Sequence, residues 1–277
     1  MNPIISIIIP CYNSEKYIAD TLDCILKQSI DNWEAVIVND GSTDRCSDIA
    51  KEYASKDIRF KVVDKKNEGV AIARNTAIKA SSGKYILPLD PDDLIAPTYA
   101  EKAISYLEKH EDTKLVYCEC NMFGSIQEKL NLPKYNYNDF IWNCSIFCSC
   151  VYRREDFDKT VGYNPNMIYM EEDYDFLISF LNENDKVYQI PETLFFYRMH
   201  GMSRSNSRRE KIPVSHLQIV MNHPDIYMKY PEKTVKFINY IDYQKKYECI
   251  ITSKDYKIGY FFMKPIRLIK GYICKIF

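Results

Sequence analysis

Strand-like and helix-like stretches alternate through the first 120 residues of this chain. Residues 4–9 form an apolar, β-branched run that is too short for a buried helix, and residues 33–38 and 59–63 resemble further strands. Between the first two runs, residues 18–26 carry apolar side chains at the helical spacing of i, i+4, i+7 and i+8. This alternation is typical of βαβ units, so we expect an α/β fold with a mainly parallel central sheet flanked by helices.

The pattern changes in the second half of the chain, where the alternation becomes irregular and Tyr, Asn and Cys become more frequent. We expect residues 121–209 to complete the same domain and to form the surface that meets a variable partner. Within this segment, residues 172–182 are predicted to be helical, and residues 186–190 and 194–197 to be two short strands. Residues 210–277 are expected to form a helical C-terminal extension.

Composition limits the classes of function. With 277 residues, of which 46% are hydrophobic, the chain can bury a sizeable core, and its net charge of −1 argues against a general nucleic-acid-binding protein. Nowhere does an uninterrupted apolar stretch approach the roughly 18 residues that a membrane span needs. The N-terminus runs directly into the first apolar stretch without a basic region or a cleavage site, so we expect a cytoplasmic protein.

The ten cysteines are expected to be reduced in that compartment. Two groups have close spacings, Cys118 with Cys120 and Cys144 with Cys148 and Cys150, but neither has the paired C-x-x-C pattern of a zinc site. We therefore favour buried, inert cysteines over a metal centre.

Three carboxylates follow the strand-like run of residues 84–89. They belong to Asp90, Asp92 and Asp93, with Pro91 between the first two. Carboxylates this close repel each other unless a cation shares them. Mg²⁺ and Mn²⁺ prefer oxygen ligands, and Mg²⁺ is commonly held by one or two carboxylates together with substrate phosphates. The turn is therefore a candidate site for a metal and a diphosphate; the alternative is a solvated turn with Pro91 at its corner.

Polar fragments also follow the other predicted strands. They are Pro10-Cys11-Tyr12-Asn13, residues 39–44 and residues 67–75. Ligands of open α/β sheets bind outside the carboxyl ends of the strands, so we expect these fragments and the acidic turn to line one cleft. A glycine-rich phosphate loop is not among them, because residues 10–17 contain no glycine and no P-loop motif occurs in the chain.

In this order, the fragments resemble those of family 2 glycosyltransferases of the GT-A fold. The resemblance extends from about Ile4 to about Ser205. It rests on six segments: I-I-I-P-C-Y-N, V-N-D-G-S-T-D, N-E-G-V-A-I-A-R-N, D-P-D-D, Glu171-Glu172-Asp173 and Tyr197-Arg198-Met199-His200. It implies a Rossmann-like central sheet, with residues 1–120 as the nucleotide-sugar-binding half. Residues 121–209 would then bind the acceptor and carry the catalytic base.

The resemblance implies a donor site at the strand ends. Tyr12 would stack on the base, Asp40 would accept hydrogen bonds from the base or the ribose, and Arg74 would face the base or a phosphate. Turn formation with helix capping is the alternative for Asp40, and a solvated helix arginine is the alternative for Arg74. The full predicted set is Pro10, Tyr12, Asn13, Glu15, Asp40, Asn67, Gly69, Arg74, Asp90, Pro91 and Asp92.

The resemblance also implies a metal site and a catalytic base. The predicted ligands of Mn²⁺ or Mg²⁺ are Asp92, Asp90 and His200, of which Asp92 would bind the ion directly. Asp173 matches the base of an inverting, single-displacement transferase, and Glu172 is the second choice. Helix capping is the alternative for both acids, and a structural role is the alternative for His200.

The expected partners are a nucleotide-sugar donor, with a UDP-sugar favoured, and a glycan or polyprenyl-linked acceptor, but no nucleic acid. Arg204, Arg208 and Arg209 are predicted to lie in a loop that closes over the phosphates. Residues 254–277 hold six basic side chains against Asp255 alone, a net charge of +5. This tail is predicted either to lie on the inner, anionic face of the cell membrane or to pack as a helix on the protein. Two other functions stay open, a non-catalytic sugar-nucleotide-binding protein and a nucleotidyltransferase.

Overall fold

The computed structural model describes residues 2–201 and 209–252. The chain forms two compact units, residues 1–207 and residues 208–277. The predicted basic loop around Arg204 and Arg208 and the basic tail from residue 254 lie outside the described residues.

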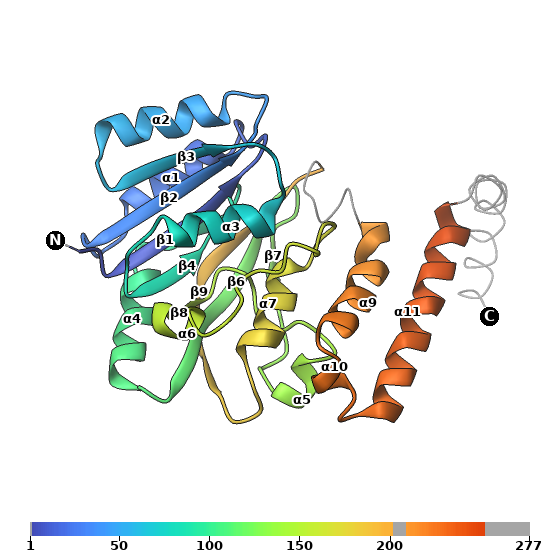
Figure 1. Ribbon diagram of the computed structural model, residues 1–277. Coiled ribbons are helices and arrows are strands. Elements are labelled where there is room, and N and C mark those ends of the chain that lie inside the picture. The colour runs from blue at the N-terminus through green and yellow to red at the C-terminus, as the bar shows by residue number, and fades with distance from the viewer. Residues whose placement is uncertain (1, 202–208, 253–277) are drawn as a thin grey trace, which may run out of the picture. The chain divides into compact units, whose positions relative to one another are not determined.

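A single nine-stranded sheet runs through the described part of the first unit (Figure 1). Its strand order is β3-β2-β1-β4-β8-β6-β9-β5, and β7 pairs with β6 outside this path. The strands are β1 (Ile5–Cys11), β2 (Trp33–Asp40), β3 (Phe60–Lys65), β4 (Tyr85–Pro88), β5 (Leu94–Ile95), β6 (Thr113–Gly124), β7 (Glu128–Leu130), β8 (Val151–Arg153) and β9 (Lys186–Met199).

Helices connect the strands of this sheet and cover it. They are α1 (Ile18–Leu26), α2 (Cys46–Lys56), α3 (Val70–Lys79), α4 (Tyr99–Lys109), α5 (Tyr137–Phe140), α6 (Arg154–Phe157) and α7 (Glu172–Phe180). Helix α3 packs on β1 and β2, α2 packs on β3, and α4 packs on β6 and β8. Strands β1 and β2 are buried along their whole length, because helices cover both faces of the sheet there.

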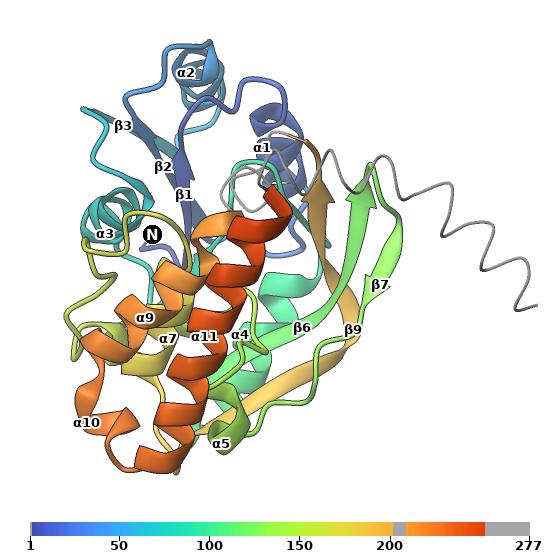
Figure 2. The same cartoon turned by 90° about the vertical axis from the view of Figure 1, so that its right-hand side faces the viewer.

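The expected α/β fold class is confirmed. Strands β3, β2, β1 and β4 are all parallel, as the alternating pattern predicts. Beyond β4 the sheet becomes mixed, because β8 is antiparallel to both β4 and β6, whereas β6 and β9 are parallel. In Figure 2, β6, β7 and β9 lie side by side as one curved layer.

The two short strands predicted at residues 186–190 and 194–197 are one long strand, β9, so the prediction of a break between them was wrong. The chain stays extended through Pro191 because the register against β6 shifts there: Ile190 lies opposite Cys118, and Thr193 lies opposite Glu119. A proline has no backbone N–H to donate, and an irregularity in the pairing lets the strand pass it.

The second unit is helical where it is described. Its elements are the short 3₁₀ helix η1 (Arg209–Lys211) and the helices α9 (Ile212–Asn222), α10 (Pro224–Tyr227) and α11 (Pro231–Thr252). Pro224 and Pro231 each occupy the first position of a helix, where the missing N–H costs no hydrogen bond. Among the described helices, none is both long enough and apolar enough to cross a membrane.

A buried carboxylate links the strands at the edge of the sheet opposite the predicted cleft. Glu34 on β2 accepts hydrogen bonds from the Ser6 hydroxyl and from the N–H groups of Ser82 and Gly83, and it pairs with Lys61 at 2.6 Å. Burial alone would raise the pKa of Glu34, but these donors outweigh it and hold the pKa below its ordinary value. The turn before β4 is thereby fixed against β1.

Gly83 is expected to tolerate no side chain. A Cβ atom there would lie 2.7 Å from the backbone of Ile5 and Ser6. Gly83→Ala should therefore lower the free energy of unfolding by about 1–3 kcal/mol, as overpacking against a rigid backbone does. Urea denaturation measures this change. Gly201→Ala is the matched control, since a Cβ at Gly201 meets nothing within 4 Å; equal effects of the two substitutions would contradict the prediction.

Candidate active site

The polar fragments that follow β1, β2, β3 and β4 lie at one edge of the sheet. These four strands are parallel neighbours in register, so their carboxyl ends point the same way. This arrangement places the loop after Cys11, the loop after Asp40, the turn after Lys65 and the acidic turn after Pro88 together. It is the position at which open α/β sheets bind ligands.

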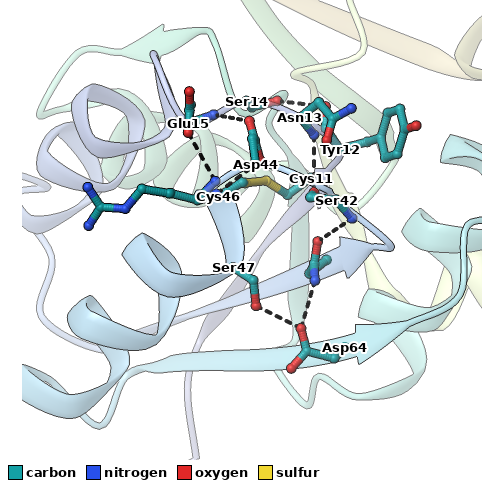
Figure 3. The surroundings of a disulfide bond; sticks show 12 residues. Cys11, Tyr12, Asn13, Ser14, Glu15, Ser42, Asp44, Cys46, Ser47 and Asp64 are labelled. Atoms are coloured by element: carbon teal, nitrogen blue, oxygen red, sulfur yellow. Dashed lines mark hydrogen bonds between the residues drawn. A yellow bond between two sulfur atoms is a disulfide. The ribbon is translucent and has the colours of Figure 1, made fainter.

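The loops after β1 and β2 are joined by hydrogen bonds (Figure 3). The Asn13 side-chain oxygen accepts from the N–H of Thr43 at 2.8 Å, and the Asn13 N–H donates to the Ser42 hydroxyl at 3.1 Å. Asn13 adopts a left-handed backbone conformation, with a φ of 50°, which asparagine tolerates better than most residues. Tyr12, one residue earlier, is 51% exposed, so its ring is available for stacking.

Further hydrogen bonds join the same two loops. The Glu15 N–H donates to Asp44 at 2.9 Å, and the Glu15 carboxylate accepts from the N–H of Arg45 at 3.0 Å. A disulfide joins Cys11, the last residue of β1, to Cys46, the first residue of α2. Asn13 and Glu15 were both predicted to contact the nucleotide-sugar donor. In the structure their hydrogen bonds hold the two loops together.

The expectation that the cysteines are reduced was therefore wrong for Cys11 and Cys46. The two residues are separated by 35 positions and become neighbours only when β1 and α2 are in place, so their spacing in the sequence carries no signal. Six other described cysteines are free; Cys118, Cys120 and Cys150 are buried, as expected, whereas Cys144 is exposed. Burial raises the pKa of the Cys118 thiol to about 12, which makes it unreactive.

Asp40 holds the turn that begins helix α3. Its carboxylate accepts hydrogen bonds from the N–H groups of Glu68 at 3.0 Å and Gly69 at 2.8 Å, and from the Lys65 ammonium at 2.8 Å. Gly69 has a φ of 96°, a conformation that favours glycine. Asp40 is 3% exposed, so a nucleotide could use only the lone pairs that these three donors leave.

Asn67 lies in the same turn, packed against the loop after β2. A Cβ atom on Gly41 would lie 2.8 Å from the Asn67 backbone nitrogen, and Gly41 itself has a φ of 72°. A glycine is therefore required at this close approach.

Arg74 is buried between two carboxylates. One of its terminal nitrogens donates to Asp90 and the other donates to Glu172, each at 2.6 Å, and the side chain is 1% exposed. The alternative of a solvated helix arginine is therefore wrong. Burial alone would lower the pKa of Arg74, but Asp90 and Glu172 outweigh it and keep the guanidinium charged.

In the acidic turn, Asp92 contacts His200. The Nε2 atom of His200 lies 2.9 Å from a carboxylate oxygen of Asp92, and the His200 ring packs on Tyr17 with centroids 4.5 Å apart. Burial and the neighbouring charge of Asp90 raise the pKa of Asp92, and the hydrogen bond from His200 opposes them only in part. A nearby cation would stabilise the ionised form of a carboxylate in this setting.

These residues fit a divalent metal. Asp92 carries oxygen atoms and His200 carries a ring nitrogen, atom types that bind divalent metals, whereas one oxygen of Asp90 is paired with Arg74. Across residues 2–201 and 209–252, no three His, Cys, Asp or Glu side chains converge into a complete metal site. One or two protein ligands suit Mg²⁺ or Mn²⁺ when substrate phosphates complete the coordination.

Arg198 is a residue of the site to which the sequence analysis gave no role. Its guanidinium lies over the rings of Tyr17 and Phe123, and its Nε donates to the backbone carbonyl of Asp92 at 2.7 Å. The backbone N–H of Arg198 donates to the carboxylate of Asp93 at 2.8 Å. The sequence did hold an indication of this placement. Arg198 and His200 are two positions apart on an extended chain, and such residues lie on the same side of a strand.

The two candidate bases differ in accessibility. Glu172 is fully buried and paired with Arg74, whereas Asp173, the second residue of α7, is partly exposed. Glu171, the residue before α7, adopts a left-handed conformation. The Asp173 carboxylate accepts a hydrogen bond from the N–H of Tyr174 at 2.9 Å, so Asp173 also satisfies a backbone donor in the first turn of α7.

The sequence of this chain is similar to the members of one known family. The sequence model described as Glycosyl transferase family 2 matches residues 6–161. The chain belongs to this family. EpsJ of Bacillus subtilis, an uncharacterized glycosyltransferase, is 30% identical over 236 residues, which cover 79% of this chain and 67% of EpsJ.

Solved structures share the fold. TarS 1–349 of S. aureus, solved with UDP-GlcNAc, superposes with a TM-score of 0.66 at 23% identity, covering 80% of this chain and 66% of that one. The mannosyltransferase PcManGT of Pyrobaculum calidifontis, solved with GDP-Man and Mn²⁺, gives 0.63 at 16% identity, covering 99% and 83%. This chain therefore has the GT-A fold, and it spans about two thirds of the length of EpsJ and TarS 1–349.

The disulfide predicts a specific pattern of thiol reactivity. In a non-reducing digest of denatured, alkylated protein, the peptides with Cys11 and Cys46 should stay linked, whereas those with Cys118 and Cys120 should carry the alkyl label. Mass spectrometry distinguishes the two states. Replacing both linked cysteines by alanine should lower the free energy of unfolding by about 4 kcal/mol in the chain-entropy description. Full alkylation of Cys11 before reduction would contradict the assignment.

Proposed function

We propose that this protein is an inverting glycosyltransferase. It would transfer a hexosyl or N-acetylhexosaminyl group from a nucleotide-diphosphate donor, with a UDP-sugar favoured, to a hydroxyl of a glycan or lipid-linked acceptor. The observation that carries the proposal is that Arg74 contacts both Asp90 of the acidic turn and Glu172, the residue directly before the partly exposed Asp173. TarS 1–349 and PcManGT, solved with nucleotide sugars, support the donor class.

The donor would bind at the strand ends. The exposed ring of Tyr12 would stack on the nucleobase, and the clasped loops after β1 and β2 would hold the nucleoside. Asp92 and His200 would hold Mn²⁺ or Mg²⁺ beside the diphosphate. The cation, when bound, supplies positive charge next to the leaving nucleoside diphosphate.

Asp173 would act as the catalytic base. The acceptor oxygen forms a bond to the anomeric carbon while the bond from that carbon to the diphosphate oxygen breaks, and Asp173 takes the hydroxyl proton. Attack from the face opposite the leaving group inverts the anomeric configuration. The N-terminal end of α7 favours the ionised form of an acid in the first turn, which keeps Asp173 able to accept a proton at neutral pH.

The charge of the C-terminal tail bears on the acceptor and on the location of the protein. A polyprenyl-linked glycan on the inner face of the cell membrane is the acceptor that the basic tail of residues 254–277 favours, since basic amphipathic segments bind anionic lipid surfaces. Binding of the full chain to vesicles with and without phosphatidylserine tests this part of the proposal.

Asp92→Ala should abolish metal-dependent donor binding, because it removes the carboxylate that faces His200. Calorimetry with UDP should then give the same weak affinity in Mn²⁺ and in EDTA. Asp112→Ala is the control, since Asp112 is an exposed partner of Lys186. If Asp92→Ala retains metal-dependent affinity, Asp92 is not the metal ligand.

Asp173→Asn should keep donor affinity and lose transfer. Removal of a general base lowers turnover by about 10²–10⁴-fold. Steady-state assays with the donor identified by binding measure this loss, and Glu171→Gln serves as the control because it changes another acid, two positions before Asp173. Near-normal transfer by Asp173→Asn would remove Asp173 from the role of base.

A further inference from the structure

A buried group of three charges connects three separate parts of the first unit. Arg74 lies on helix α3, Asp90 lies in the turn after β4, and Glu172 is the first residue of α7. The partners of Arg74 are 16 and 98 positions away in the sequence. Glu172 has no exposed surface and Arg74 has almost none, whereas the Asp90 side chain is 28% exposed, so the contact between Arg74 and Glu172 is the one that is shielded from water on both sides.

Asn75, the next residue of α3, also contacts the segment that packs against α7. The Asn75 amide donates to the Tyr163 carbonyl at 2.7 Å and accepts from the Tyr163 N–H at 2.9 Å. The Tyr163 ring lies 5.4 Å from the Arg74 guanidinium and stacks on Phe176 of α7, with centroids 4.6 Å apart. A side chain on Gly162 would collide with Asn75, with 2.7 Å between the Cβ and the amide oxygen. Helix α3 therefore holds α7 both through charge and through packing.

The chemistry of the three groups makes their geometry specific. A guanidinium presents its N–H groups in a rigid planar fork, so two carboxylates that share it are fixed relative to each other. One of these carboxylates belongs to the acidic turn, and the other is adjacent in sequence to Asp173. A displacement of Asp90 would consequently be transmitted through Arg74 to the first turn of α7.

We propose that Arg74 and Glu172 are positioning residues that couple occupation of the donor site at Asp90 to the alignment of the base, Asp173. The inference deepens the proposed function and rests on it. It assigns Glu172 a role distinct from that of base, and it assigns Arg74 a role that needs no contact with the nucleotide. Binding of a nucleoside diphosphate at the acidic turn should therefore order the start of α7.

Hydrogen–deuterium exchange of the full chain with UDP and Mn²⁺ tests this coupling. In the wild-type protein, UDP with Mn²⁺ should slow exchange in the peptide that covers the acidic turn and also in the peptide that covers residues 171–176. In Glu172→Gln the protection of the acidic turn should persist, whereas that of residues 171–176 should fall at least threefold. Glutamine keeps the size of the side chain and removes its charge, so Arg74 retains only a neutral acceptor.

Kinetics supply a second readout that a purely structural role would not change. Glu172→Gln should reduce kcat at least tenfold, with the KM for the donor within threefold of wild type. Arg74→Lys should weaken donor binding and reduce kcat, because an ammonium cannot contact both carboxylates in the geometry of the fork. If the two residues act through one contact, the double variant should be no slower than Arg74→Lys.

Arg153→Lys is the matched control. Arg153 is also buried, 7% exposed, but its guanidinium donates to the backbone carbonyls of Thr113, Leu107 and His110. This variant should lose thermal stability and keep both kinetic constants, measured on folded protein well below the melting temperature. If Arg74→Lys does not fold, Glu172→Gln carries the test alone.

The outcomes separate the two proposals. Absence of any protection in the wild-type protein would contradict the proposed donor site itself. Protection of the acidic turn without protection of residues 171–176, or unchanged coupling and kcat in Glu172→Gln, would overturn the positioning role and leave the proposed function intact. Loss of coupling in Glu172→Gln with retained donor affinity is the result that we expect.

Discussion

The arrangement of the site depends on the buried, charged guanidinium of Arg74. The Arg74 guanidinium is enclosed by protein and neutralised by carboxylates from two elements that are far apart in sequence. Removing one partner of a buried ion pair leaves an uncompensated charge, which is more costly than the pair is favourable. The position of Arg74 on α3 therefore constrains both the acidic turn and the start of α7. This constraint sets the distance between the acidic turn and Asp173, the proposed base.

Much of the fold was predictable from local patterns. The apolar, β-branched runs identified β1 and β2 because helices cover both faces of the sheet there, and the alternation with helices predicted parallel strands. The mixed half of the sheet was less legible. Strand β9 passes Pro191 by a shift of register against β6, and that depends on its partner rather than on its own sequence. Local propensity does not encode such a choice.

The site was predictable in its location and less so in its contacts. The rule that ligands bind at the carboxyl ends of parallel strands placed four motifs at one edge, and the strand register has them there. The tasks of single residues were not visible, because they depend on distant partners. Asp40 holds the turn at Gly69, Glu172 pairs with Arg74, and Cys11 joins Cys46. None of these pairs is close in sequence.

Thermal unfolding of the wild-type protein tests whether the acidic turn forms a metal-dependent nucleotide site. Melting temperatures with UDP, GDP, CMP and TDP, each in Mn²⁺ and in EDTA, report binding because a ligand of the native state raises apparent stability by mass action. We expect a rise in melting temperature for one nucleoside diphosphate, with UDP favoured, in Mn²⁺ and no rise in EDTA. A rise that EDTA does not abolish, or no rise with any of them, would contradict this expectation.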